Sequence, residues 1–182
     1  MLNTNRWAGD GIGLPPSIIK SIQRFYGSSL DFPLTISEVD PDYAIIILTS
    51  HPKMDASTAV KFVGFSFVDS THITADYADE TSGRYIGLMV IEFDPAYVKF
   101  KQTGLVTATQ GVIPANAALT QNVNPAKCLC FVYGYFEDSS VRLYFDIALS
   151  SVSASEIVFT GYSYSGSPSG APYARYQLIE LR

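Results

Sequence analysis

Several chemically versatile residues are scarce in this chain of 182 residues. It has two cysteines, two histidines and one tryptophan, and only 16% of its residues are charged. Cys128 and Cys130 offer no disulfide framework, because a bridge across one intervening residue would be strained. The sequence also lacks a phosphate-binding loop, a dinucleotide fingerprint, a nucleophile elbow and the ligand spacing of a zinc site. We therefore expect no cofactor, no metal and no catalytic residue, and we predict a non-enzymatic protein.

Positive charge is sparse and dispersed. Twelve Lys and Arg residues are scattered along the chain, and the formal net charge is −5. A surface for nucleic acid or for an anionic membrane would need clustered basic residues. Met1–Pro16 has neither a basic start nor an apolar run, so we expect no signal peptide. No stretch approaches the ~20 apolar residues of a membrane-spanning helix, so we expect no membrane insertion.

The residues that are abundant favour β-structure. Hydrophobic residues make up 47% of the chain, with 12 Tyr and 11 Phe. Aromatic and β-branched residues suit the half-buried surface of a pleated sheet. Residues 1–16 are rich in Gly, Asn and Pro and have no periodicity, which predicts an extended N-terminal arm whose large anchor is Trp7. A Trp in such an arm either covers its own domain or docks on a neighbouring chain.

A short sequence motif, called the repeated phrase here, occurs twice in the rest of the chain. YIGLMVIEF at Tyr85–Phe93 and YARYQLIEL at Tyr173–Leu181 both open on Tyr and close on Ile-Glu and a large apolar residue. Each follows segments in the same order: a strand with Lys and Gln, a Val-Asp-Pro or Val-Asn-Pro turn, an apolar strand and two further strands. We predict an internal duplication, with a first domain over residues 17–94 and a second over residues 95–182. The boundary at Asp94-Pro95 leaves almost no linker.

Glu92 and Glu180 occur in both copies of the phrase. A carboxylate in an apolar strand must be exposed, paired with a cation or placed at an interface. We expect pairing with Lys or Arg from a neighbouring strand or subunit. We also expect equivalent positions for the two glutamates, which makes them candidate interface or anchor residues together with Trp7.

Three further segments yield specific expectations. Ser17–Phe25 fits either a helical stripe or a strand, and its likeness to VKFKQ at Val98–Gln102 favours a strand. Ala44–Thr49 and Cys128–Phe136 are apolar on both faces, which predicts central strands. The two cysteines are then expected to be small core residues.

The remaining polar residues offer weak candidates. Four tyrosines near the second loop, spaced by Ser and Gly, could form an adaptable contact surface for sugar rings or could half-cover a core. His72 is expected to be an ordinary strand residue and His51 a loop residue. The acidic pair Asp40 and Asp42 and the cluster Asp76, Asp79 and Glu80 are expected to serve turns and solvation rather than glycoside hydrolysis or calcium binding. The four candidate glycan-contact tyrosines are Tyr162, Tyr164, Tyr173 and Tyr176.

The ordered pattern of IKSIQR, a Val-Asp-Pro turn, HITA and MVIEF resembles repeats of bacteriophage virion proteins of the fibre and decoration type. The second copy also resembles the H-type lectin domain, a six-stranded antiparallel β-sandwich that assembles as a trimer and in some members binds sugars. Such domains often close with Trp, where this chain has Leu88 and Tyr176. No residue aligns with a sugar ligand, so the resemblance transfers no binding site.

The resemblance implies an all-β protein of two tandem antiparallel β-sandwich domains after the arm. The expected function is that of a homotrimeric structural protein of a bacteriophage particle, assembled in the host cytoplasm. It would be a capsid decoration protein or a component of a tail or collar fibre or spike, and its partners would be other virion proteins. The alternative is a lectin-like module that recognises a host-surface glycan. A depolymerase is a weaker alternative, since two small domains leave little room for a cleft.

Overall fold

The structure, a computed structural model, describes residues 17–27, 32–50, 64–75, 86–107, 116–136, 145–163 and 172–182. These residues contain β-strands and three short 3-10 helices, which confirms the predicted all-β class. The N-terminal half contains β1 (Ile19–Gly27), β2 (Leu34–Thr35), η1 (Pro41–Tyr43), β3 (Ala44–Ser50), β4 (Phe65–Phe67), β5 (His72–Ala75) and β6 (Ile86–Phe93). After η2 (Pro95–Tyr97), the C-terminal half contains β7 (Val98–Thr107), β8 (Ala117–Ala118), η3 (Pro125–Lys127), β9 (Cys128–Phe136), β10 (Phe145–Val152), β11 (Glu156–Ser163) and β12 (Pro172–Leu181).

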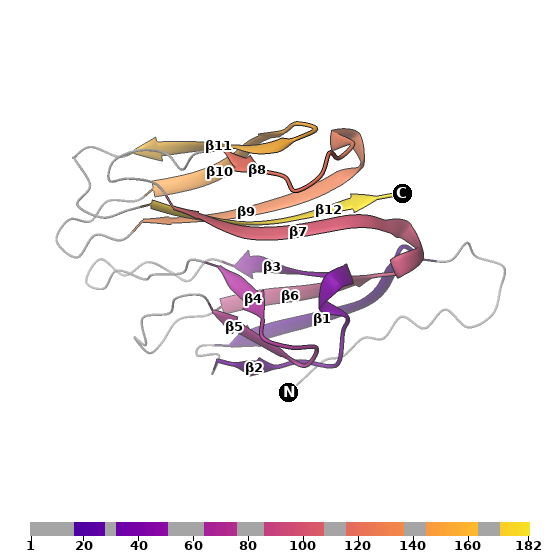
Figure 1. Cartoon of the computed structure of the whole chain (residues 1–182). Coiled ribbons are helices and arrows are strands. Elements are labelled where there is room, and N and C mark those ends of the chain that lie inside the picture. The colour runs from indigo at the N-terminus through magenta and orange to yellow at the C-terminus, as the bar shows by residue number, and fades with distance from the viewer. Residues whose placement is uncertain are drawn as a thin grey trace, which may run out of the picture.

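The two halves have the same sheet topology (Figure 1). Sheet A has the strand order β1-β6-β3 and sheet B the order β2-β5-β4. In the C-terminal half, sheet C has the order β7-β12-β9 and sheet D the order β10-β11-β8. All ladders among the described residues are antiparallel. The repeated phrase is therefore the central strand of sheet A (β6) and of sheet C (β12).

The two copies share a local irregularity in the first ladder of each half. Ile19 pairs with Phe93 and Ser21 with Glu92, so Lys20 is left over in a β-bulge. In the second copy Val98 pairs with Leu181 and Phe100 with Glu180, which leaves Lys99 over in the same way. A bulge re-aims side chains at a fixed point of a strand and is a specific feature rather than a defect. The bulge therefore recurs at the two lysines, at matching points of the two halves.

The Asp-Pro and Asn-Pro dipeptides form the turns that the sequence predicts. Asp40 caps η1 by accepting a hydrogen bond from the Asp42 N–H, and Asn124 caps η3 by accepting one from the Ala126 N–H. Pro at the first helical position has no N–H to satisfy, and its φ suits the turn. Asp94 caps η2 in the same manner, so β6 passes into β7 through four residues, 94–97.

Each half has an apolar cluster drawn from both of its sheets. The first cluster includes Phe25, Ile46, Phe65, Ile73 and Leu88, all at most 7% exposed. The corresponding second cluster is made by the following residues of sheets C and D and their connections: Ala117, Val123, Ile157, Phe159, Ala174, Tyr176 and Leu178. The opening segment is a strand in both halves, as predicted.

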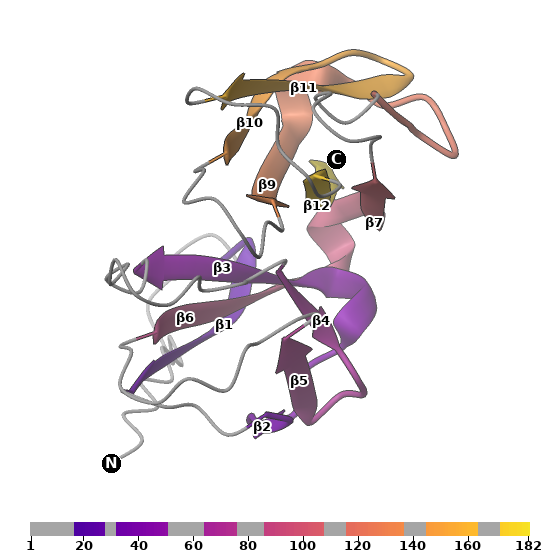
Figure 2. The same cartoon turned by 90° about the vertical axis from the view of Figure 1, so that its left-hand side faces the viewer.

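The prediction that the double-faced apolar segments are central strands is wrong. The segments form β3 and β9, and among the described residues both are edge strands of their three-stranded sheets. Their second apolar face has another cause, because a third cluster lies between the two halves and includes Ile45, Ile47 and Phe131. Figure 2 shows the β3 side of sheet A directed at sheet C. Contact with the other half therefore explains the apolar residues on both faces of these strands, a pattern that a central strand would also show.

Candidate functional site at the joint between the halves

The joint is defined here as the contact between β3 with η1 on one side and the outer face of sheet C on the other. Its apolar part is the third cluster, in which Ile45, Phe93, Val98 and Ile179 are at most 4% exposed. Five partly buried side chains pack around it: Tyr43, Ile47, Ile91, Phe131 and Leu181. Burying apolar area at roughly 25 cal/mol per Å² makes this cluster a main source of attraction between the halves.

A buried glutamine supplies the polar part of the joint. Gln177 on β12 is 2% exposed, and its amide faces the free edge of β3. The Gln177 Nε2 donates to the Ile46 carbonyl at 2.6 Å, and the Ile46 N–H donates to Gln177 Oε1 at 3.0 Å. One side chain thus satisfies both outward backbone groups of a residue that is 0% exposed. A buried backbone group without a partner would be costly.

Tyr133 on β9 continues this arrangement along β3. Its hydroxyl donates to the Ile46 carbonyl at 3.0 Å and accepts a hydrogen bond from the Leu48 N–H at 2.9 Å. Burial raises the pKa of Tyr133 to about 12, so the hydroxyl keeps the proton that it donates. The polar clamp, defined as Gln177 and Tyr133, gives the β3 edge the partners that a fourth strand would otherwise provide.

A lysine crosses the joint from the other direction. Lys101 on β7 donates to the Pro41 carbonyl, and its ammonium lies 5.2 Å from the centre of the Phe67 ring. Burial lowers the pKa of Lys101 to about 8, and the carboxylates of Asp42 and Asp40 offset part of this effect. The positive charge is therefore held in a partly desolvated place between two halves of the chain.

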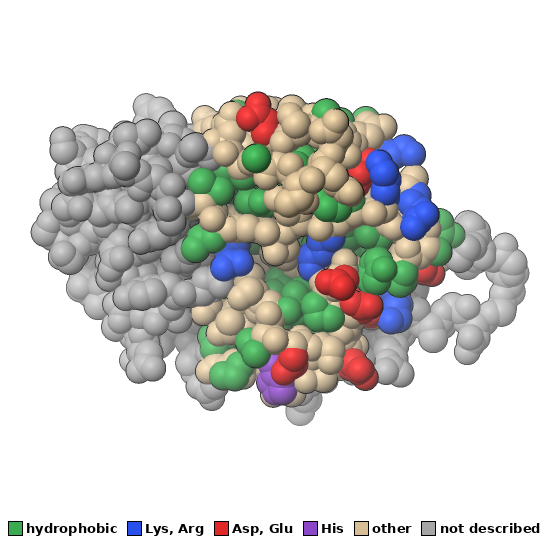
Figure 3. Space-filling view, viewed as in Figure 1, with side chains coloured by type: hydrophobic (Ala, Val, Ile, Leu, Met, Phe, Trp, Pro, Cys, Tyr) green, Lys and Arg blue, Asp and Glu red, His purple; other side chains and the backbone are tan. Residues whose placement is uncertain are grey.

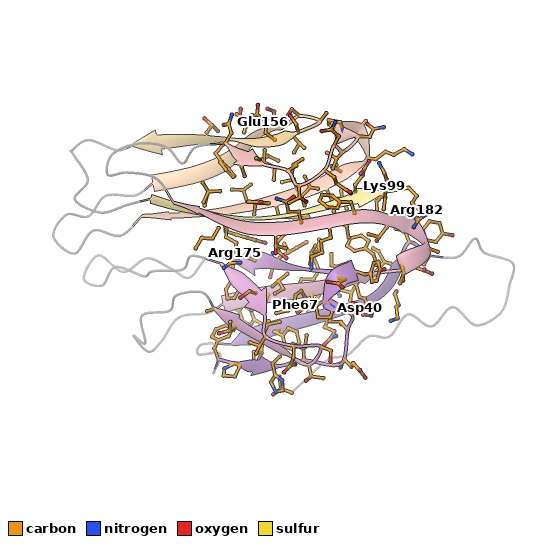
Figure 4. All side chains as sticks on the ribbon, in the orientation of Figure 1. Asp40, Phe67, Lys99, Glu156, Arg175 and Arg182 are labelled. Atoms are coloured by element: carbon orange, nitrogen blue, oxygen red, sulfur yellow. The ribbon has the colours of Figure 1, made fainter. Side chains whose placement is uncertain are left out.

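The joint borders an open polar groove with a volume of about 370 Å³. Figure 3 shows Lys and Arg side chains on the C-terminal half close to acidic side chains across the joint, and Figure 4 places Lys99 and Arg182 at the same end. The residues that line the groove are Asp42, Tyr43, Val98, Lys99, Phe100, Lys101, Thr103 and Arg182. Aromatic rings with cationic and hydroxyl donors are groups that can bind a polar or anionic ligand.

Gly64 marks another close approach across the joint. Its φ is +138°, and a Cβ at this position would lie 2.7 Å from Cδ of Arg175 on β12. Only glycine adopts this backbone region readily while leaving room for the arginine stem. Figure 4 shows Arg175 directed at the N-terminal half beside β4.

Glu92 and Glu180 occupy equivalent places in the two halves. Lys20 Nζ lies 2.7 Å from Glu92 Oε1, and the Asp40 N–H donates to the same oxygen at 3.0 Å. Lys99 Nζ lies 2.9 Å from Glu180 Oε1. The Asn124 N–H donates to that oxygen at 2.8 Å. The predicted pairing with a lysine of the neighbouring strand is confirmed in both copies, and each lysine is the bulged residue.

The two glutamates differ in the hydrogen bonding of their second carboxylate oxygen, Oε2. The Ser21 hydroxyl donates to Glu92 Oε2 at 3.1 Å, whereas Phe100 stands at the corresponding position beside Glu180. Glu180 Oε2 is buried without a hydrogen-bond partner among the described residues. Burial raises the pKa of Glu180, but the Asn124 N–H and the Lys99 ammonium outweigh it, so the pKa is lowered overall. Each carboxylate connects the bulge to the turn before β3 or β9, and neither lies on an outer face.

The predicted glycan-contact tyrosines are not brought together by the described residues. Tyr176 is 4% exposed in the second core cluster, where its hydroxyl accepts a hydrogen bond from Gln102 Nε2 at 2.6 Å. Only the backbone is described for Tyr162 in β11 and Tyr173 in β12. Tyr164 and Trp7 lie outside the described residues, as do His51 and the cluster Asp76, Asp79 and Glu80.

The other weak candidates can be placed in the fold. His72 lies in β5, as predicted, and its Nδ1 is 3.0 Å from the Asp69 carboxylate in a turn. The Thr71 N–H, together with His72, lowers the pKa of Asp69 to about 2. Cys128 and Cys130 are free and partly buried against the second core. Within the described ranges, no three His, Cys, Asp or Glu side chains are grouped as metal ligands would be, and no helix is long and apolar enough to cross a membrane.

Sequence reasoning missed Gln177, Tyr133 and Lys101, the polar residues of the joint. A signal was present for Gln177, because an amide in the middle of an otherwise apolar strand must find hydrogen bonds. Comparison with known proteins adds no assignment: no family model, no curated protein and no solved structure matches this chain.

The polar clamp generates a first prediction. Gln177→Leu keeps the side-chain volume but leaves the N–H of Ile46 unpaired, at about 1–3 kcal/mol per orphaned buried group. We expect the free energy of unfolding, measured by urea denaturation, to fall by at least that amount. The matched control Gln121→Leu changes an exposed glutamine and should stay within about 0.5 kcal/mol of the wild type. Equal stabilities for the two variants would contradict the role of the clamp.

Lys101 generates a pH prediction. Its pKa is about 8 when folded and near 10.4 when unfolded, so the unfolded chain binds more protons between these values. Stability should therefore rise with pH in this window, by at most about 1.4 kcal/mol per pH unit. Urea denaturation from pH 7.5 to 9.5 should show that the wild type and the control Lys127→Met gain stability relative to Lys101→Met as the pH rises. Identical pH profiles of stability for all three proteins would contradict this contribution of Lys101.

The two glutamate carboxylates accept unequal numbers of hydrogen bonds, which generates a third prediction. Lys99→Met leaves Glu180 with one donor, whereas Lys20→Met leaves Glu92 with two. We expect the loss of unfolding free energy to be larger for Lys99→Met, at about 1–2 kcal/mol given the half-exposed ammonium. Because the folded pKa of Glu180 is lowered, this difference should be present above pH ~4.5 and fade as the pH falls below it. A larger effect at Lys20 would refute the prediction.

Proposed function

We propose that this chain is a non-enzymatic structural component of a bacteriophage particle, a capsid decoration protein or part of a tail or collar fibre or spike. In this proposal its halves are tandem copies of one β-sandwich unit, and it works as a homotrimer with other virion proteins. The resemblance to fibre and decoration repeats motivates the proposal. The joint is the observation that carries it.

The joint supports a mechanical role because it fixes one unit on the other. The connection between β6 and β7 has four residues, 94–97, and the polar clamp and the third apolar cluster hold β3 against sheet C. Units joined by a flexible linker move by default when their interface is small and polar. Here buried amide hydrogen bonds add a directional constraint to apolar packing. A particle component must hold such a geometry under force.

Particle association provides the test. We expect the full-length chain to co-sediment with purified particles of the phage that encodes it and to be identified there by mass spectrometry. A chain lacking residues 1–16, and the variant Trp7→Ala, should fold but be depleted from particles if the predicted arm is the anchor. Normal incorporation of both would refute the anchor, and absence of the full-length chain from particles would refute the proposed function.

The groove at the joint favours a second candidate function, the recognition of a host-surface glycan. Tyr43 supplies a ring, and Lys99, Lys101 and Arg182 supply cationic donors. These groups suit a sugar that carries a carboxylate or sulfate. A glycan array with acidic glycans should give signals that are lost in Arg182→Gln and kept in the control Arg24→Gln. An array without signals from the folded oligomer would eliminate this candidate.

A further inference from the structure

Lys101 differs from Lys20 and Lys99 in the group that accepts its hydrogen bond. The ammonium groups of Lys20 and Lys99 lie 2.7 and 2.9 Å from a glutamate carboxylate, and both side chains are more than half exposed. Lys101 instead donates to the backbone carbonyl of Pro41. A carbonyl accepts a hydrogen bond from a neutral amine as well as from an ammonium group, whereas a carboxylate strongly favours the ammonium form. Lys101 can therefore lose a proton and keep its hydrogen bond.

The surroundings of Lys101 disfavour its charged form on balance. The Phe67 ring, with its centre 5.2 Å from Nζ, and the carboxylates of Asp42 and Asp40 favour the ammonium form. Removal from water at the joint outweighs them and lowers the pKa of Lys101 to about 8. At pH 7.5 roughly a quarter of the molecules then carry a neutral amine at this position, against about one in a thousand for an ordinary lysine. A neutral, desolvated lysine is a nucleophile.

The groove beside the joint combines this amine with two cationic side chains. Lys101, Lys99 and Arg182 all line it, and Asp42 is the one carboxylate residue in the lining. The Arg182 Nε donates to the Val98 carbonyl at 3.0 Å, which holds this exposed side chain beside β7. Figure 4 places Lys99 and Arg182 at the same end of the molecule. The groove volume of about 370 Å³ suits a small ligand, and the two cations favour one with a carboxylate.

We propose that the groove binds small carbonyl compounds that carry a carboxylate, namely 2-oxo acids or the open-chain form of sugar acids, through an imine with Lys101. Lys99 and Arg182 receive the ligand carboxylate. The proposal deepens the second candidate function, on which its biological role rests, because it names the chemistry that holds an acidic sugar in this groove.

The reaction needs no oxidant, reductant or further co-reactant. The neutral Lys101 amine attacks the carbonyl carbon, and a carbon–nitrogen bond forms as a carbinolamine. The carbon–oxygen bond then breaks, and the oxygen leaves as water with the two hydrogens of the amine. Protonation of the imine nitrogen restores one N–H, which can donate to the Pro41 carbonyl as the free amine does. The hydrogen bond across the joint is therefore compatible with the adduct.

Reductive trapping of the purified full chain provides the test. Limiting glyoxylate with sodium cyanoborohydride at pH 7.5 should convert the imine to carboxymethyl-lysine, which peptide mass spectrometry locates. We expect at least about tenfold more adduct on Lys101 than on the exposed Lys127, because the neutral fractions of the two amines differ on the order of a hundredfold. In urea that unfolds the chain, this preference should disappear. Equal labelling of the two lysines in the folded chain, or an unchanged preference in urea, would overturn the proposal.

The ligand carboxylate is tested with acetaldehyde, which offers the carbonyl alone. Arg182→Gln should lower the ratio of Lys101 to Lys127 adduct for glyoxylate and leave the ratio for acetaldehyde unchanged. The control Arg24→Gln, at an exposed residue of β1, should change neither ratio. A glyoxylate ratio that is unaffected by Arg182→Gln would overturn the assigned carboxylate contact.

Glucuronate distinguishes the two sources of the ligand. Its adduct on Lys101 would support sugar acids, and an adduct with glyoxylate alone would support 2-oxo acids. A glycan array measures reversible binding without a reductant, and particle co-sedimentation does not involve the groove. Failure of the trapping experiment is therefore distinguishable from failure of either proposed function.

Discussion

The structure depends on how the free edge of β3 is satisfied. An edge strand of a three-stranded sheet presents backbone N–H and C=O groups that must find water or another partner. In this chain they are removed from water, because Ile46 is 0% exposed. The amide of Gln177 and the hydroxyl of Tyr133 take the place of a further strand. The hydrogen bonds fix the register between the halves, and the third apolar cluster supplies the attraction.

The two halves are alike where each maintains its own fold, and they differ at several residues where they meet. The parts that maintain each unit stay alike: the bulged lysine, the buried glutamate and the capped Pro turn occur in both halves. The parts that hold the halves together differ, since Gln177 replaces Met89 and Lys101 replaces Ile22 on matching rungs of the ladders. Internal symmetry therefore identifies what the fold requires, and departures from it identify what the contact requires.

The sequence predicted much of the fold because its strongest signals are local. The strand at Ile19–Gly27, the Pro turns and the paired glutamates follow from alternation, turn chemistry and the need to pair a buried charge. Strand order, in contrast, does not follow from local sequence signals. Ile45 and Ile47 are apolar because another half covers them, and no pattern within β3 distinguishes that cover from a neighbouring strand. The polar clamp was missed for the same reason, since the partners of Gln177 and Tyr133 lie 131 and 85 to 87 positions away.

The joint also contains a partly desolvated positive charge. Lys101 brings a cation into the contact, where burial disfavours the charged form and a carbonyl and an aromatic ring favour it. A fully apolar residue there, as Ile22 is in the other half, would avoid the desolvation. It would also lose the hydrogen bond of the ammonium to the Pro41 carbonyl. A charged group on one of two otherwise similar surfaces discriminates between partners at some loss of affinity. The lysine therefore favours the η1 surface, whose Pro41 carbonyl accepts a hydrogen bond from the ammonium, over an apolar surface of similar shape.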